Sequence, residues 1–420
     1  MIKLIKTLRN CFLLLAFCAT PVYGQESNGE DEFLMPALSG SYSVGTASFT
    51  IENKLVRKPT KTQRICVKVW YPSDSIVAND NYNRYLEGYD LCEIVSLFKK
   101  MNVNNAEIEK LSSYKTRSTR HIAVSDQEEK FPVIIFSPGY YFGFNDIYSC
   151  FIENLASNGY VVVAPSHVHD HICIKGQNGE DNSLNSRRAA LPYFQMWWKD
   201  KRNLRNYEKK KNQPALSEYY LKGLTRFKKK LNQWESNTLF VVEYLKGGGA
   251  QLPAELVSRM DLTRIGAIGQ SFGGALSNHL CVTNDEIDAA VNLDGFQFGE
   301  VSYLSSSKPL MLVEGDQQLR WRIGNEYIYR NCNNLQYARI KGSLHFVFSD
   351  LPFFNKFIDE ERVNNLTGIE EGQKAITWIN HLVISFFGQH LQGLDSNLAE
   401  ERIDNEMFLY QISNRCIYLR

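Results

Sequence analysis

The sequence predicts an α/β fold, with a central, mostly parallel sheet flanked by helices and carrying helical insertions. Two observations support this. Short, continuous apolar runs at 132–136 and 160–164 enclose a helical pattern at 146–158, which is the strand–helix–strand order of a parallel, buried sheet. Further on, the serine of the pentapeptide at 269–273 lies between an apolar strand and a helical segment.

The N-terminal part of the fold is predicted to be antiparallel. Residues 41–45, 47–51 and 64–70 are rich in β-forming residues and end in turn signals, which is typical of the first antiparallel strands of such a sheet. The polar, partly helical residues 79–129 then interrupt the pattern. We expect an insertion there that covers one edge of the sheet.

A second insertion is predicted over residues 180–247, which are aromatic and basic. Residues 216–245 carry apolar side chains at helical spacing and contain no proline, which indicates a helix. We favour a helix packed on the sheet with its lysines in water. The alternative is a lid or interfacial surface that meets lipid or an anionic polymer.

The most specific local pattern is Gly-Gln-Ser-Phe-Gly around Ser271. Residues 264–268 form the preceding strand and residues 274–277 the first helical turn. A serine on a tight strand-to-helix turn is the nucleophile elbow of an α/β-hydrolase fold. Glycines beside it allow strained backbone angles and close contact with the strand and helix.

Two later residues complete a catalytic order. An apolar strand at 289–293 ends at Asp294, and another at 336–340 is followed by His345. Such folds order their triad as serine, acid and histidine along the chain. A serine hydroxyl needs a histidine to take its proton, and a carboxylate must hold that histidine in the right tautomer. We therefore predict Ser271 as the nucleophile, Asp294 as the acid and His345 as the base.

Two other groups of residues compete for roles at this edge. Asp316 follows the strand at 309–313, where most α/β-hydrolases keep their carboxylate, but the direct passage from strand to turn favours Asp294. His167, His169 and His171 alternate on an extended segment and could converge on zinc. Serine chemistry needs no metal, so we expect no metal and no cofactor, with these histidines lining a pocket or facing solvent.

The bulk properties are those of one large domain over residues 25–420. The chain has 420 residues, is 44% hydrophobic and carries a formal net charge of +1, which gives no indication of a nucleic-acid partner. Basic residues before the apolar run at 12–17, and small residues before position 25, predict a signal peptide at 1–24 and export. A lipoprotein signal ending at Cys18 is disfavoured because Phe17 is bulky.

Five segments resemble the α/β-hydrolase family of plasma-type (type II) platelet-activating factor acetylhydrolases and their bacterial relatives. The resemblance runs from about residue 40 to 354 and is weakest over 180–247. It is carried by Tyr-Ser-Val-Gly at 42–45, Trp-Tyr-Pro-Ser at 70–73, Phe-Ser-Pro-Gly at 136–139, the elbow with Phe272, and Gly-Ser-Leu-His at 342–345.

The resemblance implies the same triad, Ser271, Asp294 and His345, and an oxyanion hole made by the backbone N–H groups of Tyr140 and Phe272. Two departures stand in the oxyanion loop. Pro138 replaces a histidine that is common in the family, and 140–142 is a bulky Tyr-Tyr-Phe. Both departures are expected to change the shape of the acyl pocket and to leave ester hydrolysis itself intact.

The expected function is an exported serine carboxylic ester hydrolase that works through an acyl-enzyme. The resemblance implies short-acyl esters such as platelet-activating-factor-like or oxidised phospholipids, with peripheral membrane contact as a further expectation. The alternatives are an esterase or amidase acting on a polysaccharide, a peptide or a xenobiotic ester. A non-catalytic binding protein is disfavoured because all three triad residue types follow the right strands.

Overall fold

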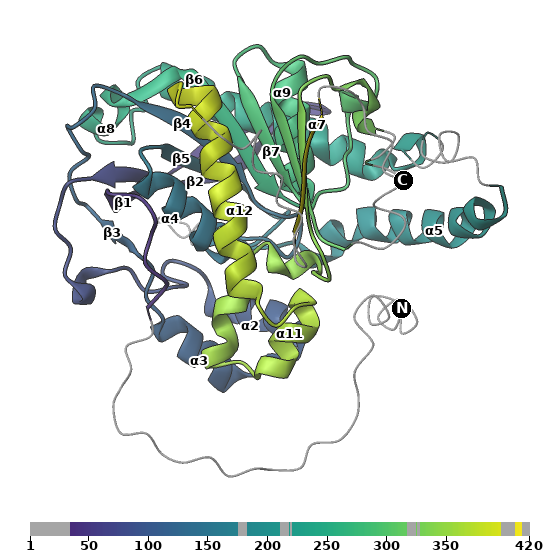
Figure 1. Ribbon diagram of the computed structural model, residues 1–420, viewed down its shortest axis with the longest axis horizontal. Helices are drawn as coiled ribbons and strands as arrows, with labels where there is room; N and C mark the ends of the chain where they lie inside the picture. Colours follow the sequence, from purple (N-terminus) through teal and green to yellow (C-terminus); the bar gives the residue numbers. More distant parts are fainter. Residues whose placement is uncertain are drawn as a thin grey trace, which may run out of the picture.

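In the computed structural model, residues 34–174, 183–210, 218, 221–316, 325, 328–395 and 408–413 are described. They form a mixed ten-stranded sheet with the order β10-β9-β8-β7-β6-β4-β5-β2-β1-β3 (Figure 1). Its strands are β1 Ser43–Leu55, β2 Lys58–Ser73, β3 Ser118–Arg120, β4 Phe131–Ser137, β5 Val161–His167, β6 Met260–Gln270, β7 Ala289–Leu293, β8 Leu310–Glu314, β9 Leu335–Ile340 and β10 Phe408–Ser413.

The central strands, β5, β4, β6, β7, β8 and β9, are parallel to one another. Every residue of β4, β5, β7 and β8 is buried, as expected for strands covered on both faces. The hairpin of β1 and β2 is antiparallel, and so is the pairing of β2 with β5. The α/β-hydrolase type of sheet and its antiparallel N-terminal strands, as predicted, are confirmed.

Helices cover both faces of the sheet. The α-helices are α2 Leu91–Phe98, α3 Asn105–Ser113, α4 Ser149–Ser157, α5 Ser186–Lys210, α7 Thr225–Lys246, α8 Ala254–Ser258, α9 Phe272–Thr283, α11 Glu360–Thr367 and α12 Gly372–Phe387. Short helical turns are η1 Asn79–Asn81, η2 Lys99–Met101, η3 Asn145–Tyr148, η4 Glu300–Ser302, η5 Tyr329–Asn331, η6 His345–Val347, η7 Leu351–Lys356 and the π-turn η8 Gly388–Gln392.

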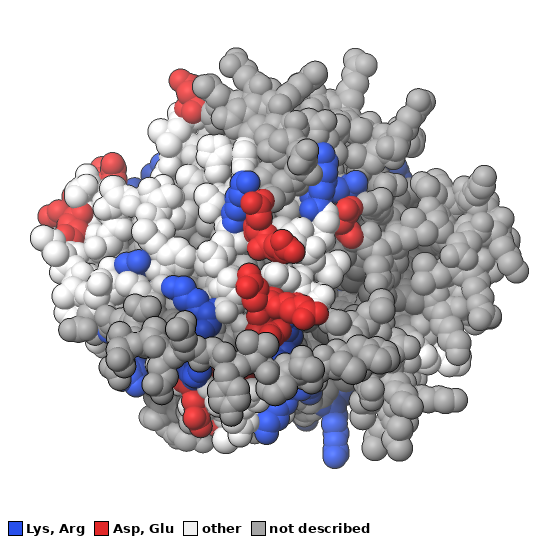
Figure 2. Space-filling model, turned by 60° about the horizontal axis from the view of Figure 1, so that its bottom comes forward, with Lys and Arg blue, Asp and Glu red and all other residues white. Residues whose placement is uncertain are grey.

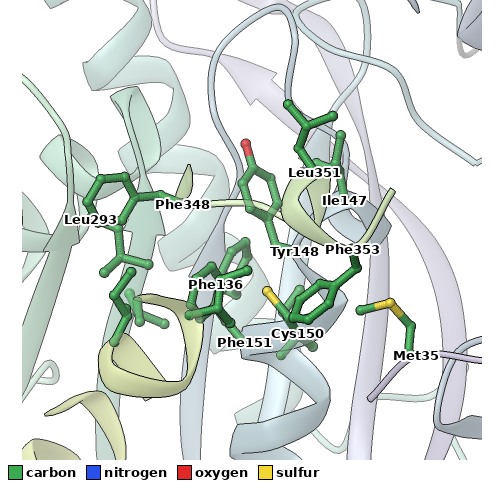
Figure 3. Close-up of a cluster of buried hydrophobic side chains, with 14 of the residues drawn as sticks. Met35, Phe136, Ile147, Tyr148, Cys150, Phe151, Leu293, Phe348, Leu351 and Phe353 are labelled. Carbon is green, nitrogen blue, oxygen red and sulfur yellow. The ribbon is translucent and has the colours of Figure 1, made fainter. Parts of the chain in front are cut away.

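Alternation along the strands divides the core in two. Ile134 and Phe136 of β4 pack with α4 and α12, whereas Val133 and Ile135 pack with α7 and α9. This follows from the two-residue period of a strand. Figure 3 shows part of the first cluster, where Phe136, Phe151 and Phe348 meet.

The predicted insertion at 79–129 contributes more than an edge cover. It supplies β3, which pairs in parallel with β1 at the edge of the sheet. Its aromatic residues Tyr85, Phe98 and Tyr114 are fully buried in the same cluster as α4 and α12. This segment is therefore part of the main core.

The second predicted insertion, 180–247, contains α5 and α7 with part of its length outside the described residues. The helix expected at 216–245 is observed over Thr225–Lys246, and its Trp234 is fully buried against the sheet. The helix α5 extends away from the sheet (Figure 1). Leu191, Phe194 and Trp198 on α5 are exposed.

The predicted signal peptide at 1–24, with Cys18, lies outside the described residues. In the described part of the chain, no helix is long and apolar enough to cross a membrane. Small groups of acidic and basic side chains alternate over the described surface in Figure 2, in line with the net charge of +1. The described cysteines form no disulfide bonds with one another; they are Cys66, Cys92, Cys150, Cys173, Cys281 and Cys332.

Glu153 on α4 makes stability depend on pH. Burial raises the pKa of Glu153 from 4.5 to about 7, against hydrogen bonds from Ser118 and from the Arg117 N–H and the charge of Lys68. A folded-state pKa above the unfolded value gives stability that is present below about pH 4.5 and is lost as the pH rises to about 7.

We therefore expect Glu153→Gln to remove this pH dependence. The difference in free energy of unfolding between wild type and Glu153→Gln should shift by about 2–3 kcal/mol between pH 4.5 and 8, against wild type at the higher pH. Denaturant unfolding at both pH values measures it. Glu255→Gln, at an exposed position on α8, is the matched control. A constant difference for Glu153→Gln would contradict the effect of burial.

Candidate active site

The turn from β6 into α9 holds Ser271 in a strained conformation. Its φ is 58° and its ψ is −120°, a combination that side chains other than glycine rarely adopt. A Cβ on Gly273 would lie 2.0 Å from the carbonyl oxygen of Ser137, and one on Gly269 would lie 2.4 Å from it. The glycines are required because the elbow passes directly against β4. Ser271 remains half-exposed at the end of the strand.

Asp294 and His345 form a close pair beside this elbow. Nδ1 of His345 lies 2.6 Å from Oδ2 of Asp294. The second oxygen, Oδ1, accepts the N–H of Gly315 at 2.8 Å. The Asp294 side chain is fully buried while that of His345 is 33% exposed. The carboxylate is thus held from behind and the imidazole can reach the open side.

Asp316, the rival acid, makes a different contact. Its carboxylate is exposed and accepts the N–H of Gly342 at 3.0 Å, and its own N–H donates to the carbonyl of Ser343 at 2.8 Å. These bonds hold the loop that leads to His345. The structure therefore brings Asp294, and not Asp316, to the histidine.

A second buried carboxyl, Glu314, lies behind Asp294. It accepts hydrogen bonds from Asn325 at 2.6 Å and from the Tyr337 hydroxyl at 3.1 Å. Burial raises the pKa of Glu314 to about 7, with the Asn325 hydrogen bond opposing this and the charge of Asp294 adding to it. Below that pH Glu314 is mostly neutral.

The backbone N–H groups of Tyr140 and Phe272 are the predicted oxyanion donors. Within the described residues, neither the N–H of Tyr140 nor that of Phe272 has a hydrogen-bond acceptor. Phe272 is the first residue of α9, where the helix leaves its N–H groups free and its dipole favours negative charge. Backbone amides of this kind, one from the turn at Phe272 and one from the loop after β4 at Tyr140, can stabilise an oxyanion.

The loop that carries Tyr140 is fixed from the insertion. The hydroxyl of Tyr193 on α5 donates to the Tyr140 carbonyl at 3.0 Å, and the N–H of Tyr141, whose φ is 73°, donates to the carbonyl of Asp170 at 3.2 Å. The Tyr140 ring packs against Phe227, at 5.8 Å between ring centroids. The bulky loop therefore turns its first aromatic ring into the core.

Beneath this loop lies a buried ion pair between Asp170 and Lys230. Trp234 Nε1 also donates to Asp170, at 3.0 Å. Burial lowers the pKa of Lys230, and the Asp170 carboxylate opposes that shift. All three residues support the segment whose backbone holds Tyr141.

The histidines considered for zinc do not converge. His167 is the last residue of β5, and His169 has a φ of 73°, which breaks the alternation of an extended segment. His171 Nε2 accepts the N–H of His167 at 2.9 Å, while His169 Nδ1 lies 2.8 Å from the Ser183 carbonyl. Burial lowers the pKa of His171 to about 4. Among the described residues, no cluster of histidine, cysteine or acidic side chains could hold a metal ion.

One contact at the site was not anticipated. Within the described residues Ser271 has no hydrogen bond to His345. Instead, Nε2 of His345 lies 3.0 Å from Nε2 of Gln270, the residue before the serine. Gln270 belongs to the pentapeptide around Ser271, but its side-chain orientation depends on Tyr148, which is 122 positions away.

The sheet, the strained serine turn and the adjacent acid–histidine pair together define a protein of the α/β-hydrolase class. The chain belongs to the family described as platelet-activating factor acetylhydrolase, isoform II, whose model matches residues 27–407.

Two relatives agree with this membership, and a solved structure shares the fold. The chain is 26% identical to a platelet-activating factor acetylhydrolase of Cavia porcellus over 65% of its length and 60% of that protein. It is 25% identical to one of Gallus gallus over 69% of its length and 70% of that protein. A ferulic acid esterase from Streptomyces cinnamoneus has a similar fold, with a TM-score of 0.67, 19% identity and coverage of 90% of this chain and 99% of that one.

Proposed function

We propose that this protein is a serine-dependent carboxylic ester hydrolase. The observation that carries the proposal is the contact of the buried Asp294 carboxylate with His345, 2.6 Å apart, beside the strained Ser271 turn. A buried carboxylate on Nδ1 leaves Nε2 of the imidazole as the base. Family membership supports the same reaction class.

The reaction proceeds through a covalent acyl-enzyme. Ser271 Oγ attacks the acyl carbonyl carbon while its proton passes to Nε2 of His345. The oxyanion is held by the N–H groups of Tyr140 and Phe272, and each such donor is worth about 3 kcal/mol in the transition state. His345 then gives the proton to the leaving alkoxide. Water, activated by the same nitrogen, releases the acid and restores the serine.

Short-acyl esters, such as platelet-activating-factor-like or oxidised phospholipids, are the proposed substrates. The names of the two relatives support this class. Aromatic packing next to the oxyanion donors supports a short acyl group. Phe272 lies 5.6 Å from Phe227 and 5.8 Å from Phe298 between ring centroids, so these rings fill the space on that side of the elbow.

Export and lipid contact are part of the proposal. The basic, apolar and small segments of residues 1–24 support a cleaved signal peptide. The exposed side chains of Leu191, Phe194 and Trp198 on α5 support peripheral contact with a lipid surface. Co-sedimentation with phosphatidylcholine vesicles tests this contact, and Trp198→Ala with Phe194→Ala should weaken it.

The deciding experiment is the intact mass of the mature protein before and after a fluorophosphonate probe. We expect one probe per chain, none on Ser271→Ala, and full labelling of Ser277→Ala, whose hydroxyl is buried in α9 and donates to the Gly273 carbonyl. No labelling of the wild type would refute the serine mechanism. The same spectrum tests cleavage before Gln25.

A further inference from the structure

Gln270, the last residue of β6, connects the predicted base to the oxyanion loop. Its side chain is buried. Its amide nitrogen lies 3.0 Å from Nε2 of His345 and 3.4 Å from the His345 carbonyl oxygen. Its amide oxygen accepts the hydroxyl of Tyr148 at 3.1 Å. The Tyr148 oxygen in turn accepts the N–H of Gly139 at 3.1 Å.

The donors in this chain of hydrogen bonds set its direction. The Gly139 N–H can only donate, so the Tyr148 oxygen accepts it and the single hydroxyl proton of Tyr148 is directed to the Gln270 oxygen. The amide nitrogen of Gln270 must then face His345. A Cβ on Gly139 would lie 2.7 Å from Oε1 of Gln270 and 3.0 Å from the Tyr148 hydroxyl, so glycine leaves the room that this arrangement needs.

Tyr148 is well fixed for such a role. It is buried, packs against Phe136 at 5.2 Å between ring centroids, and its hydroxyl points away from Phe136 and Phe151 (Figure 3). Burial raises the pKa of Tyr148 far above neutral pH. The Tyr148 hydroxyl therefore keeps its proton at neutral pH and remains a hydrogen-bond donor.

The contact of Gln270 with His345 has a chemical consequence. A neutral imidazole with its proton on Nδ1, towards Asp294, has one lone pair on Nε2, and Gln270 donates to it. An imidazolium in the same position would direct an N–H at the amide N–H₂ group. Gln270 thus stabilises the unprotonated form of His345 and occupies the acceptor that the Ser271 hydroxyl needs.

We propose that Gln270, oriented by Tyr148, is a positioning residue that keeps His345 unprotonated in the resting protein and yields Nε2 to Ser271 only when the acylation step begins. This deepens the proposed function, because it assumes that His345 is the base. It adds a residue that touches neither the acyl group nor the oxyanion.

The other ionisable groups near His345 are unchanged in all the variants that test this proposal. Asp294 contacts Nδ1, Glu314 lies behind Asp294, Asp316 binds the preceding loop, and Asp350 lies behind Tyr148, where it accepts the N–H groups of Ser149 and Cys150. On the helices that pack against η6, Arg362 of α11 pairs with Glu107 and Lys374 of α12 pairs with Glu371. A shift in the pKa of His345 caused by a substitution at Gln270 is therefore measured with the surrounding charges unchanged.

The test is an NMR titration of histidine-labelled full-length protein without substrate. The signal of His345 is assigned by its loss in His345→Asn. In Gln270→Leu we expect the pKa of His345 to rise by about one unit, the size of one lost buried hydrogen bond. Gln270→Glu should raise it further, because a carboxylate accepts from the imidazolium. Tyr148→Phe should raise it as well, because the amide can then turn its oxygen to Nε2.

The control is Gln233→Leu, which removes a buried glutamine of α7 bonded to Asn237 at 2.9 Å and should leave the His345 titration unchanged. An unchanged titration in both Gln270→Glu and Tyr148→Phe would overturn the proposal and leave Gln270 a packing residue. Fluorophosphonate labelling separates the two proposals: absence of labelling with a shifted titration refutes the serine mechanism and leaves only the effect of Gln270 on the protonation of His345, whereas labelling with no shift refutes the role of Gln270 alone.

Discussion

Alanine in place of His345 is expected to lower kcat on a short-acyl ester by about 10⁵–10⁶-fold, as loss of the base does in serine hydrolases. The reason is that, among the described residues, no other side chain at the elbow is placed to take the proton of Ser271, and Gln270 beside it donates to Nε2. KM should change little, because the imidazole does not hold the acyl group. Steady-state kinetics on a chromogenic acetate ester measures both constants.

The matched control for this variant is His381→Ala, an exposed histidine on α12. We expect it to retain wild-type kcat. A kcat of His345→Ala within tenfold of wild type would remove the histidine from the mechanism and, with it, the proposed reaction.

Asparagine in place of Asp294 is expected to lower kcat by about 10⁴-fold. The amide can present its N–H₂ group to His345, which favours the tautomer with the proton on Nε2, and that tautomer cannot accept the proton of Ser271. Asp316→Asn should cost roughly tenfold or less, because it weakens one exposed hydrogen bond to Gly342. Circular dichroism of both variants checks that the fold is kept.

The comparison of the two aspartates decides the acid directly. If Asp316→Asn is the more damaging change, the acid moves from the end of β7 to the end of β8. Equal, small losses in both would indicate that His345 works without a carboxylate partner.

Elements with short-range causes could be predicted from the sequence. The fully buried strands β4, β5, β7 and β8 are mostly apolar in sequence, and the serine turn depends on glycines within two positions of Ser271. The hairpin of β1 and β2 follows from its β-rich sequence. These patterns can be predicted from short stretches of sequence, because burial and backbone conformation there depend on residues that are close along the chain.

Only the three-dimensional structure shows which side chain at the edge of the sheet contacts His345. Asp294 and Asp316 follow neighbouring strands, and only the turn at Asp294, with φ of 55°, directs its carboxylate to His345. Three alternating histidines predicted a common face, but the strand ends at His167 and the face is lost. Backbone bends at strand ends are set by packing, which spacing alone does not record.

By itself, the sequence determined the fold class, the serine turn and the places of Asp294 and His345 just after the ends of strands, because each depends on neighbouring residues. Only the tertiary structure decided that α7, from the segment least like the family, supports the oxyanion loop through Lys230 and Asp170. It also decided that Tyr148 contacts Gln270 and that Gln270 contacts His345. Those contacts join residues 60 to 122 positions apart, and hydrogen bonds of that kind arise only when the sheet and its helices have packed.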